Sequence, residues 1–120
     1  MKALFAFVGL IAAATPLAAH HSWPVAYDHL VTVKGTVAAF QWANPHPMIT
    51  LQVQSKDGQE KWLIGGPAIN RMEANGWTKE TIRPGDVITG IGYQFADGQK
   101  ILRLERVVLP DGKELKLYGR

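Results

Sequence analysis

Alternating apolar and polar positions divide most of the chain into short β-strands. Over residues 31–42, Val31, Val33 and Val37 alternate with polar residues, which predicts a strand with one buried face. Gly35 interrupts this strand, where a bulge or sharp bend would let one strand serve two sheets. The same period of two predicts further strands over 48–55, 60–64, 87–95 and 101–109, and a final extended segment over 114–118.

Turn residues and one helical segment separate these strands. Asp57-Gly58 is a strong hairpin signal between alternating runs. Gly65-Gly66-Pro67 breaks the sheet, and residues 68–75 then read as a short helix that ends at Gly76. We expect a second short helical turn over 78–83, before the next strand.

The order of these elements predicts a fold class. Three strands, one short helix and two more strands match the five-stranded Greek-key barrel called the OB-fold. We therefore predict an all-β, OB-fold-like barrel with the helix between strands three and four. A lipocalin-like or SH3-like small barrel is the nearest alternative.

The first nineteen residues are typical of a secretory signal peptide. Lys2 precedes an apolar run over 3–14, and small residues lead up to a cleavage point after Ala19. A run of about twelve apolar residues is too short for a membrane span, which needs roughly 20. We expect a signal peptide over 1–19, an N-terminal arm over 20–30, a barrel domain over 31–120 and a periplasmic location.

Composition excludes several classes of protein. Cleavage after residue 19 of 120 leaves 101 residues, which suffice for one domain. This mature chain has 12 basic and 10 acidic side chains. This mixed charge and the expected export argue against a nucleic acid partner. We also expect no membrane association after cleavage. The chain has no cysteine, so disulfides, thiolate metal sites and cysteine nucleophiles are excluded.

Histidines at the expected mature N-terminus suggest a metal site. Cleavage after Ala19 would give His20 a free α-amine, with His21 beside it. His46 lies between two prolines in the turn over 43–47, which an OB-fold places at the rim of its binding face. Imidazole is the commonest metal ligand, and a sulfur-free site of this kind suits copper or zinc. We therefore predict a copper site formed by these three histidines.

The same residues have plainer interpretations. A histidine pair near a chain end is often a solvated tail, and His46 could simply form a hydrogen bond within its own loop. We expect Trp23, Trp42 and Asn44 to line the site as ligand-binding residues. We expect Trp62 and Trp77 to pack in the core and His29 to lie on the surface.

Five short motifs occur in order along the chain: His20-His21-Ser22, Trp42-x-Asn44-Pro45-His46, Gly76-Trp77, Pro84-Gly85-Asp86 and Leu109-Pro110-Asp111-Gly112. This combination resembles one known family, the small exported bacterial proteins of domain of unknown function 6152. This chain has Ala43 and Pro47 where family members often carry threonine or another residue. The resemblance implies a periplasmic, mostly β, single-domain protein, and it supplies no catalytic residues.

Two functions from different classes follow from the sequence. The first is a periplasmic binding protein that holds copper, the one cofactor that we expect. The alternative is a metal-free interaction module that binds a protein, peptide or glycan at the barrel rim. We expect no enzymatic activity and no catalytic residue, since the two serines, Ser22 and Ser55, suggest no catalytic triad and no glycine-rich phosphate loop precedes a helix.

Overall fold

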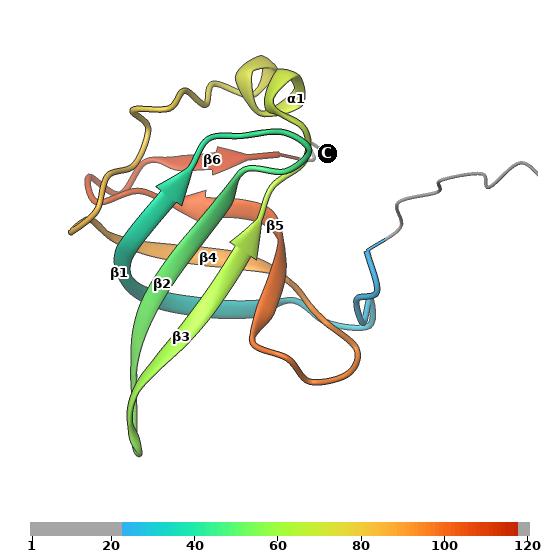
Figure 1. Ribbon diagram of the computed structural model, residues 1–120, viewed down its shortest axis with the longest axis vertical. Coiled ribbons are helices and arrows are strands. Elements are labelled where there is room, and N and C mark those ends of the chain that lie inside the picture. The colour runs from blue at the N-terminus through green and yellow to red at the C-terminus, as the bar shows by residue number, and fades with distance from the viewer. Residues whose placement is uncertain (1–22, 118–120) are drawn as a thin grey trace, which may run out of the picture.

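The computed structural model describes residues 23–117, which form a small closed β-barrel with one helix (Figure 1). The barrel strands are β1 (Val31–Gln41), β2 (Met48–Ser55), β3 (Gly58–Gly65), β4 (Val87–Gln94) and β5 (Ile101–Val108). Helix α1 (Ile69–Ala74) lies between β3 and β4 in the chain, and the short β6 (Glu114–Lys116) pairs with β5. The prediction of a five-stranded, OB-fold-like barrel with one intervening helix is confirmed.

A parallel strand pair closes the barrel. The strands follow the order β3-β2-β1-β4-β5-β6, with antiparallel neighbours throughout. At the two ends of the five-stranded set, β3 and β5 pair in parallel, from Leu63 opposite Ile101 to Gly65 opposite Arg103. Closure removes the unpaired edges that would otherwise expose backbone donors and acceptors.

The first strand pairs with two partners along its length, within one sheet. Its first half pairs with β4 up to Thr36, and its second half pairs with β2 from Thr36 onward. The register shifts between Val37 and Ala39, two to four residues after the glycine where we expected the interruption. This bulge reverses the alternation, so that Val37 and then Phe40 both pack with the core.

The barrel interior and the space beneath the helix form one apolar core. Buried side chains of this core are Val33, Val37, Ile49, Leu51, Ile64, Met72, Trp77, Ile82, Ile88, Leu102, Leu104, Val107 and Leu117. Trp77 is 1 % exposed, and Trp62 packs against the cluster from its margin. Both tryptophans therefore have the structural role expected from the sequence.

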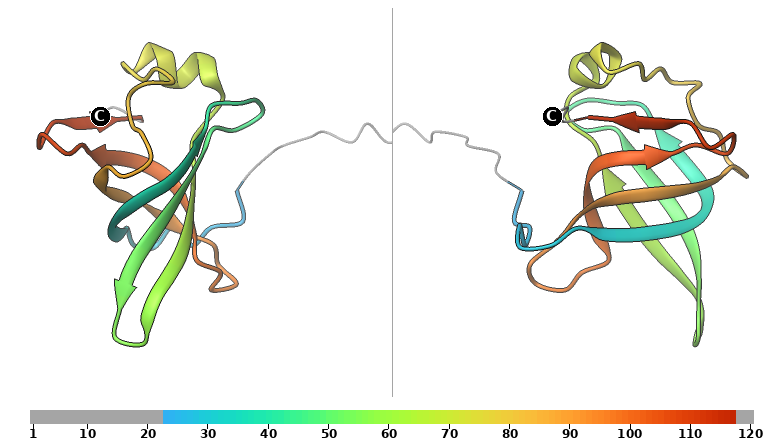
Figure 2. Two further views of the ribbon diagram at one scale, coloured as in Figure 1. Left: turned by 60° about the vertical axis from the view of Figure 1, so that its left-hand side comes forward. Right: turned by 180° about the vertical axis from the view of Figure 1, so that it is seen from behind.

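Helix α1 lies at one end of the barrel, and the β2–β3 hairpin extends beyond the opposite end (Figure 2). Within residues 23–117 no helix is long and apolar enough to cross a membrane. The expectation of a second helical turn over 78–83 is wrong, because residues 79–82 form turns and bends. There, the Thr81 amide donates to the Thr78 carbonyl, Thr81 Oγ1 accepts from the Thr78 amide and Thr78 Oγ1 accepts from the Glu80 amide, so one hydrogen-bonded turn forms and no helix follows it.

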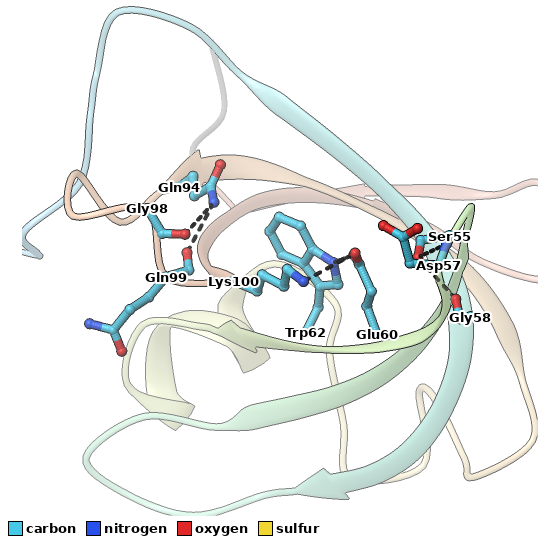
Figure 3. A network of polar contacts seen from close by, with 9 residues as sticks. All are labelled: Ser55, Asp57, Gly58, Glu60, Trp62, Gln94, Gly98, Gln99 and Lys100. Atoms are coloured by element: carbon cyan, nitrogen blue, oxygen red, sulfur yellow. Dashed lines mark hydrogen bonds and ion pairs between the residues drawn. The ribbon is translucent and has the colours of Figure 1, made fainter.

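Hydrogen bonds and an ion pair between polar side chains link neighbouring elements of the barrel at the end away from the helix (Figure 3). Glu60 accepts a hydrogen bond from the Trp62 indole at 3.3 Å and pairs with Lys100 Nζ at 3.1 Å. These contacts, with Lys100 first, lower the pKa of the Glu60 carboxyl below its ordinary value. Because Lys100 precedes β5, the pair joins β3 to the β4–β5 loop beside the parallel seam.

Replacing Gly35 by alanine should destabilise the fold. A Cβ at this position would lie 2.5 Å from the Gln52 carbonyl oxygen and 2.9 Å from Val53 Cγ2, so the backbone of β2 would have to move. We expect Gly35→Ala to lower the free energy of unfolding by about 1–3 kcal/mol in chemical denaturation. The exposed neighbour variant Lys34→Ala should change it by less than about 0.5 kcal/mol. Equal stability of the two variants would contradict the close strand contact.

Candidate functional site

The side chain of His46 is held by the chain segment that follows β3. His46 is half-buried, and its Nδ1 lies 3.1 Å from the Gly66 carbonyl oxygen. Because a carbonyl oxygen can only accept a hydrogen bond, Nδ1 carries the hydrogen of the neutral ring. The lone pair is therefore on Nε2. Metal-ligating histidines commonly use this arrangement, in which a backbone carbonyl orients the ring and fixes its tautomer.

The N-terminal arm packs directly on this histidine. The ring centroids of Trp23 and His46 are 4.8 Å apart, and Phe95 meets the same indole edge-on at 6.0 Å. Backbone hydrogen bonds fix the arm next to the β4–β5 loop, from Ala26 N to Gln94 O and from Ala96 N to Pro24 O, both at 2.9 Å. The chain thus reaches the His46 ring through an anchored segment.

Two residues of the β2–β3 pair form the floor beneath the indole. Met48 and Gly65 are opposite each other in this ladder. A Cβ at Gly65 would overlap the ring of Trp23 and would lie 3.2 Å from Met48 Sδ. Only glycine leaves room for the indole here, and the thioether borders the same point.

An open hollow of about 450 Å³ adjoins His46. It is lined by Trp23, His46, Pro67, Ala68, Asn70, Arg71 and Arg103. One wall is therefore aromatic, and the remaining lining includes an amide and two guanidinium groups. A hollow of this size and polarity has room for a small polar ligand or for a short stretch of chain.

The charged side chains around the hollow are predominantly cationic. Arg103 Nη1 lies 2.6 Å from Glu105 Oε1, and the Arg103 guanidinium is 5.8 Å from the Tyr27 ring centroid. Burial raises the pKa of the Glu105 carboxyl, while Arg103 and, more weakly, Arg71 oppose that rise. Two guanidiniums thus share one partly buried carboxylate.

The structure brings some of the predicted site residues together. His46 and Trp23 are in contact, whereas His20 and His21 lie outside the described residues. Within residues 23–117, no group of three or more histidine, cysteine, aspartate or glutamate side chains is close enough to hold a metal ion. Of the predicted ligands, the described part of the chain therefore supplies His46.

The other candidates do not line the hollow. Trp42 packs edge-on against Phe40 at 5.7 Å, beside the core, and does not line the hollow. Asn44 Oδ1 accepts a hydrogen bond from the Ile69 amide at 3.5 Å, so its side chain ties the β1–β2 turn to the start of α1. His29 is exposed and pairs with Asp28 at 3.1 Å, in agreement with the expected surface position.

Sequence reasoning missed Met48, Arg71 and Arg103 as neighbours of this site. Met48 reads as an ordinary strand residue, and Arg103 as a polar position of an alternating strand. The available signal was the Gly65-Gly66 pair, because consecutive glycines at a strand end also mark places where another group approaches the backbone closely.

Comparison with solved structures supports the fold. The mitochondrial single-stranded DNA binding protein Rim1 from S. cerevisiae matches with a TM-score of 0.51 at 14 % identity, over 68 % of this chain and 92 % of that chain. The protein TiaS, in a complex with an isoleucine tRNA and ATP, gives a TM-score of 0.46 at 12 % identity, over 74 % of this chain and 20 % of that chain. At such identity the likeness to Rim1 shows the barrel architecture alone.

Sequence comparison identifies the family. A search of curated proteins finds no match. The model of a family of unknown function, DUF6152, matches residues 7–102, which include part of the expected leader, the arm, the His46 turn and most of the barrel. The chain belongs to the DUF6152 family.

Proposed function

We propose that this protein binds a transition-metal ion, with copper favoured, through His46 together with His20 and His21 of a processed N-terminus. The observation that carries the proposal is the hydrogen bond from His46 Nδ1 to the Gly66 carbonyl, which leaves Nε2 as the ring's ligand atom. The protein would act in the periplasm as a copper-handling or metal-buffering protein, without enzymatic activity.

The anchored arm supports the participation of the N-terminal histidines. Trp23 packs on the His46 ring, and His21 precedes Trp23 by two residues. His20 and His21 lie outside the described residues, so their inclusion rests on their closeness to Trp23 in the sequence.

The donor set favours copper. Imidazole and amine nitrogens bind copper more tightly than other divalent first-row ions, following the Irving–Williams order. The chain has no cysteine to compete as a ligand. A histidine between two prolines is also restrained before binding, which reduces the conformational entropy lost on coordination.

Copper titration of protein that begins at His20 tests the proposal. We expect His46→Gln to raise the dissociation constant for copper roughly tenfold or more. A tenfold change corresponds to about 1.4 kcal/mol of binding free energy. Removing the two terminal imidazoles in His20→Ala/His21→Ala should have a similar effect. The affinities are measured by competition with a chromophoric chelator, and glutamine keeps a donor for the Gly66 carbonyl.

The matched control is His29→Ala, which removes an exposed histidine outside the hollow and should leave affinity unchanged. Acetylation of the His20 amine provides a second comparison, because it blocks one expected ligand without changing a side chain. Copper affinity that is the same in wild type and in His46→Gln, with both folded by circular dichroism, would refute the proposed site.

The role of the anchored arm is tested by a double-mutant cycle. Gly65→Ala should displace Trp23, since the new Cβ would overlap its ring, and should weaken copper binding by roughly tenfold through loss of preorganisation. In a Trp23→Ala background the same glycine substitution should have little further effect, because no ring remains to be displaced. Independent, additive losses would contradict the role of the Trp23–Gly65 contact.

A second candidate function is a metal-free interaction module that binds a protein, peptide or glycan at the barrel rim. The hollow beside Trp23, with Asn70, Arg71 and Arg103 in its lining, favours this alternative. It gains support if chelator-treated protein retains a ligand that is lost in Trp23→Ala and unaffected by His46→Gln.

A further inference from the structure

Side chains from separate elements of the fold meet at the hollow beside His46. Trp23 comes from the N-terminal arm, Asn70 and Arg71 come from α1, and Arg103 comes from β5. The volume of about 450 Å³ lies within the usual range of small-molecule sites, roughly 300–1,000 Å³. An aromatic ring, an amide and guanidinium groups therefore line a space that suits one small organic molecule.

We propose that this hollow binds a sugar acid, which is a pyranose ring that carries a carboxylate and several hydroxyl groups. The inference rests on the second candidate function, because it assigns a chemical class to the ligand at the barrel rim, and it requires no metal ion. Every side chain involved belongs to residues 23–117. The lining favours each part of such a ligand: the anionic group, the hydroxyl groups and the apolar face of the ring.

The two guanidinium groups favour a carboxylate on the ligand. Guanidinium and carboxylate groups form charge-assisted hydrogen bonds, which are roughly twice as strong as neutral ones. Arg71 and Arg103 already have partners, because both act on the Glu105 carboxyl and both have further interactions within the protein. A guanidinium has several N–H donors in a planar fork, so one side chain can hold a protein partner and a ligand oxygen together.

The partners of Arg103 hold its side chain in place. Its Nη1 lies 2.6 Å from Glu105 Oε1, and its guanidinium carbon lies 5.8 Å from the Tyr27 ring centroid. The Arg103 side chain is 18 % exposed, and Glu105 is not one of the residues that line the hollow. A restrained arginine loses little conformational entropy when a ligand binds, which favours affinity.

The neutral groups of the lining favour hydroxyl groups on the ligand. Since the hydrogen of the His46 ring is on Nδ1, Nε2 is the acceptor that this ring offers. Asn70 Oδ1 accepts from the Arg71 amide at 2.9 Å, so the Asn70 side chain offers its N–H groups as donors. A hydroxyl group both donates and accepts, and a ring with several hydroxyl groups therefore satisfies both residues.

The indole of Trp23 favours an apolar ring face. It is fixed over Gly65 and against the His46 ring, and it lines the hollow. A pyranose ring has one face made largely of C–H groups, which packs well on an aromatic side chain. A sugar acid combines this face with a carboxylate and hydroxyl groups in a single molecule.

Titration of ¹⁵N-labelled protein with galacturonate and with its methyl ester, in the presence of a chelator, tests the proposal. The ester keeps the ring and its hydroxyl groups and lacks the negative charge. We expect galacturonate to shift the indole N–H signal of Trp23, which Trp23→Phe identifies, and to bind roughly tenfold more tightly than the ester. Trigalacturonate is titrated alongside, because tighter binding of the trimer indicates an acidic oligosaccharide and equal binding indicates a free sugar acid.

Two arginine variants form a matched pair. Arg71→Ala and Arg83→Ala each remove one exposed arginine and the same charge, and Arg83 does not line the hollow. Arg71→Ala should raise the dissociation constant for galacturonate roughly tenfold and that for the ester by less than about twofold. Arg83→Ala should change neither constant. Trp23→Ala should weaken the binding of both probes, since the ring packs on the indole in either case.

The proposal is overturned if galacturonate leaves the Trp23 signal unshifted, if the acid and the ester bind equally, or if Arg71→Ala weakens both to the same extent. A neutral sugar or a peptide that binds at Trp23 while galacturonate does not would keep the second candidate function and overturn the sugar-acid assignment.

His46→Gln separates the sugar-acid site from the copper site. Glutamine keeps both a donor and an acceptor, so galacturonate affinity should change by less than about threefold while copper affinity falls. Galacturonate binding without copper binding would overturn the metal proposal alone. Copper binding without galacturonate binding would overturn the sugar-acid site alone.

Discussion

Closure of the barrel through the parallel β3–β5 pair is the constraint on which the site depends. The last residues of this pair are Gly65 and Arg103, so closure puts the glycine floor and a guanidinium side by side. The chain leaving β3 then presents the Gly66 carbonyl to His46. A barrel left open at this seam would keep its core strands but would separate the two sides of the hollow. The residues around the hollow are therefore brought together by the same strand pairing that satisfies the backbone hydrogen bonds of the sheet edges.

Packing and charged side chains contribute separately to ligand binding at this rim. The indole of Trp23 fills space over Gly65 and orders the arm, which favours any ligand that needs a preorganised chain. Arg71 and Arg103 line the adjoining hollow, and both act on the partly buried carboxylate of Glu105. Guanidinium groups in a hollow of this kind can donate hydrogen bonds to anionic groups of an organic ligand.

Local sequence patterns predicted the fold, whereas the contacts around His46 depend on tertiary structure. Alternation over 48–55 matched β2, and the interruption expected at Gly35 in the first strand is a register shift between Val37 and Ala39. The helical turn expected over 78–83 is instead a single turn closed by the Thr81 amide and the Thr78 carbonyl, followed by bends. The contacts of His46 with Trp23 and Gly66 join residues twenty or more positions apart, and no periodicity encodes them. Likewise, a glycine pair that reads as a sheet breaker gives no indication of which ring will cover it.

The hydrogen bond between His46 and Gly66 also links ligand occupancy to resistance against proteolysis. The two residues are separated by twenty positions, so the oriented imidazole exists only while the barrel is folded. Any ligand that binds this form alone stabilises it, by about 2.7 kcal/mol when its concentration is a hundred times the dissociation constant. Since proteases attack transiently opened chains, an occupied molecule would be degraded more slowly than an empty one. The abundance of the protein would then follow the supply of its ligand without any change in synthesis.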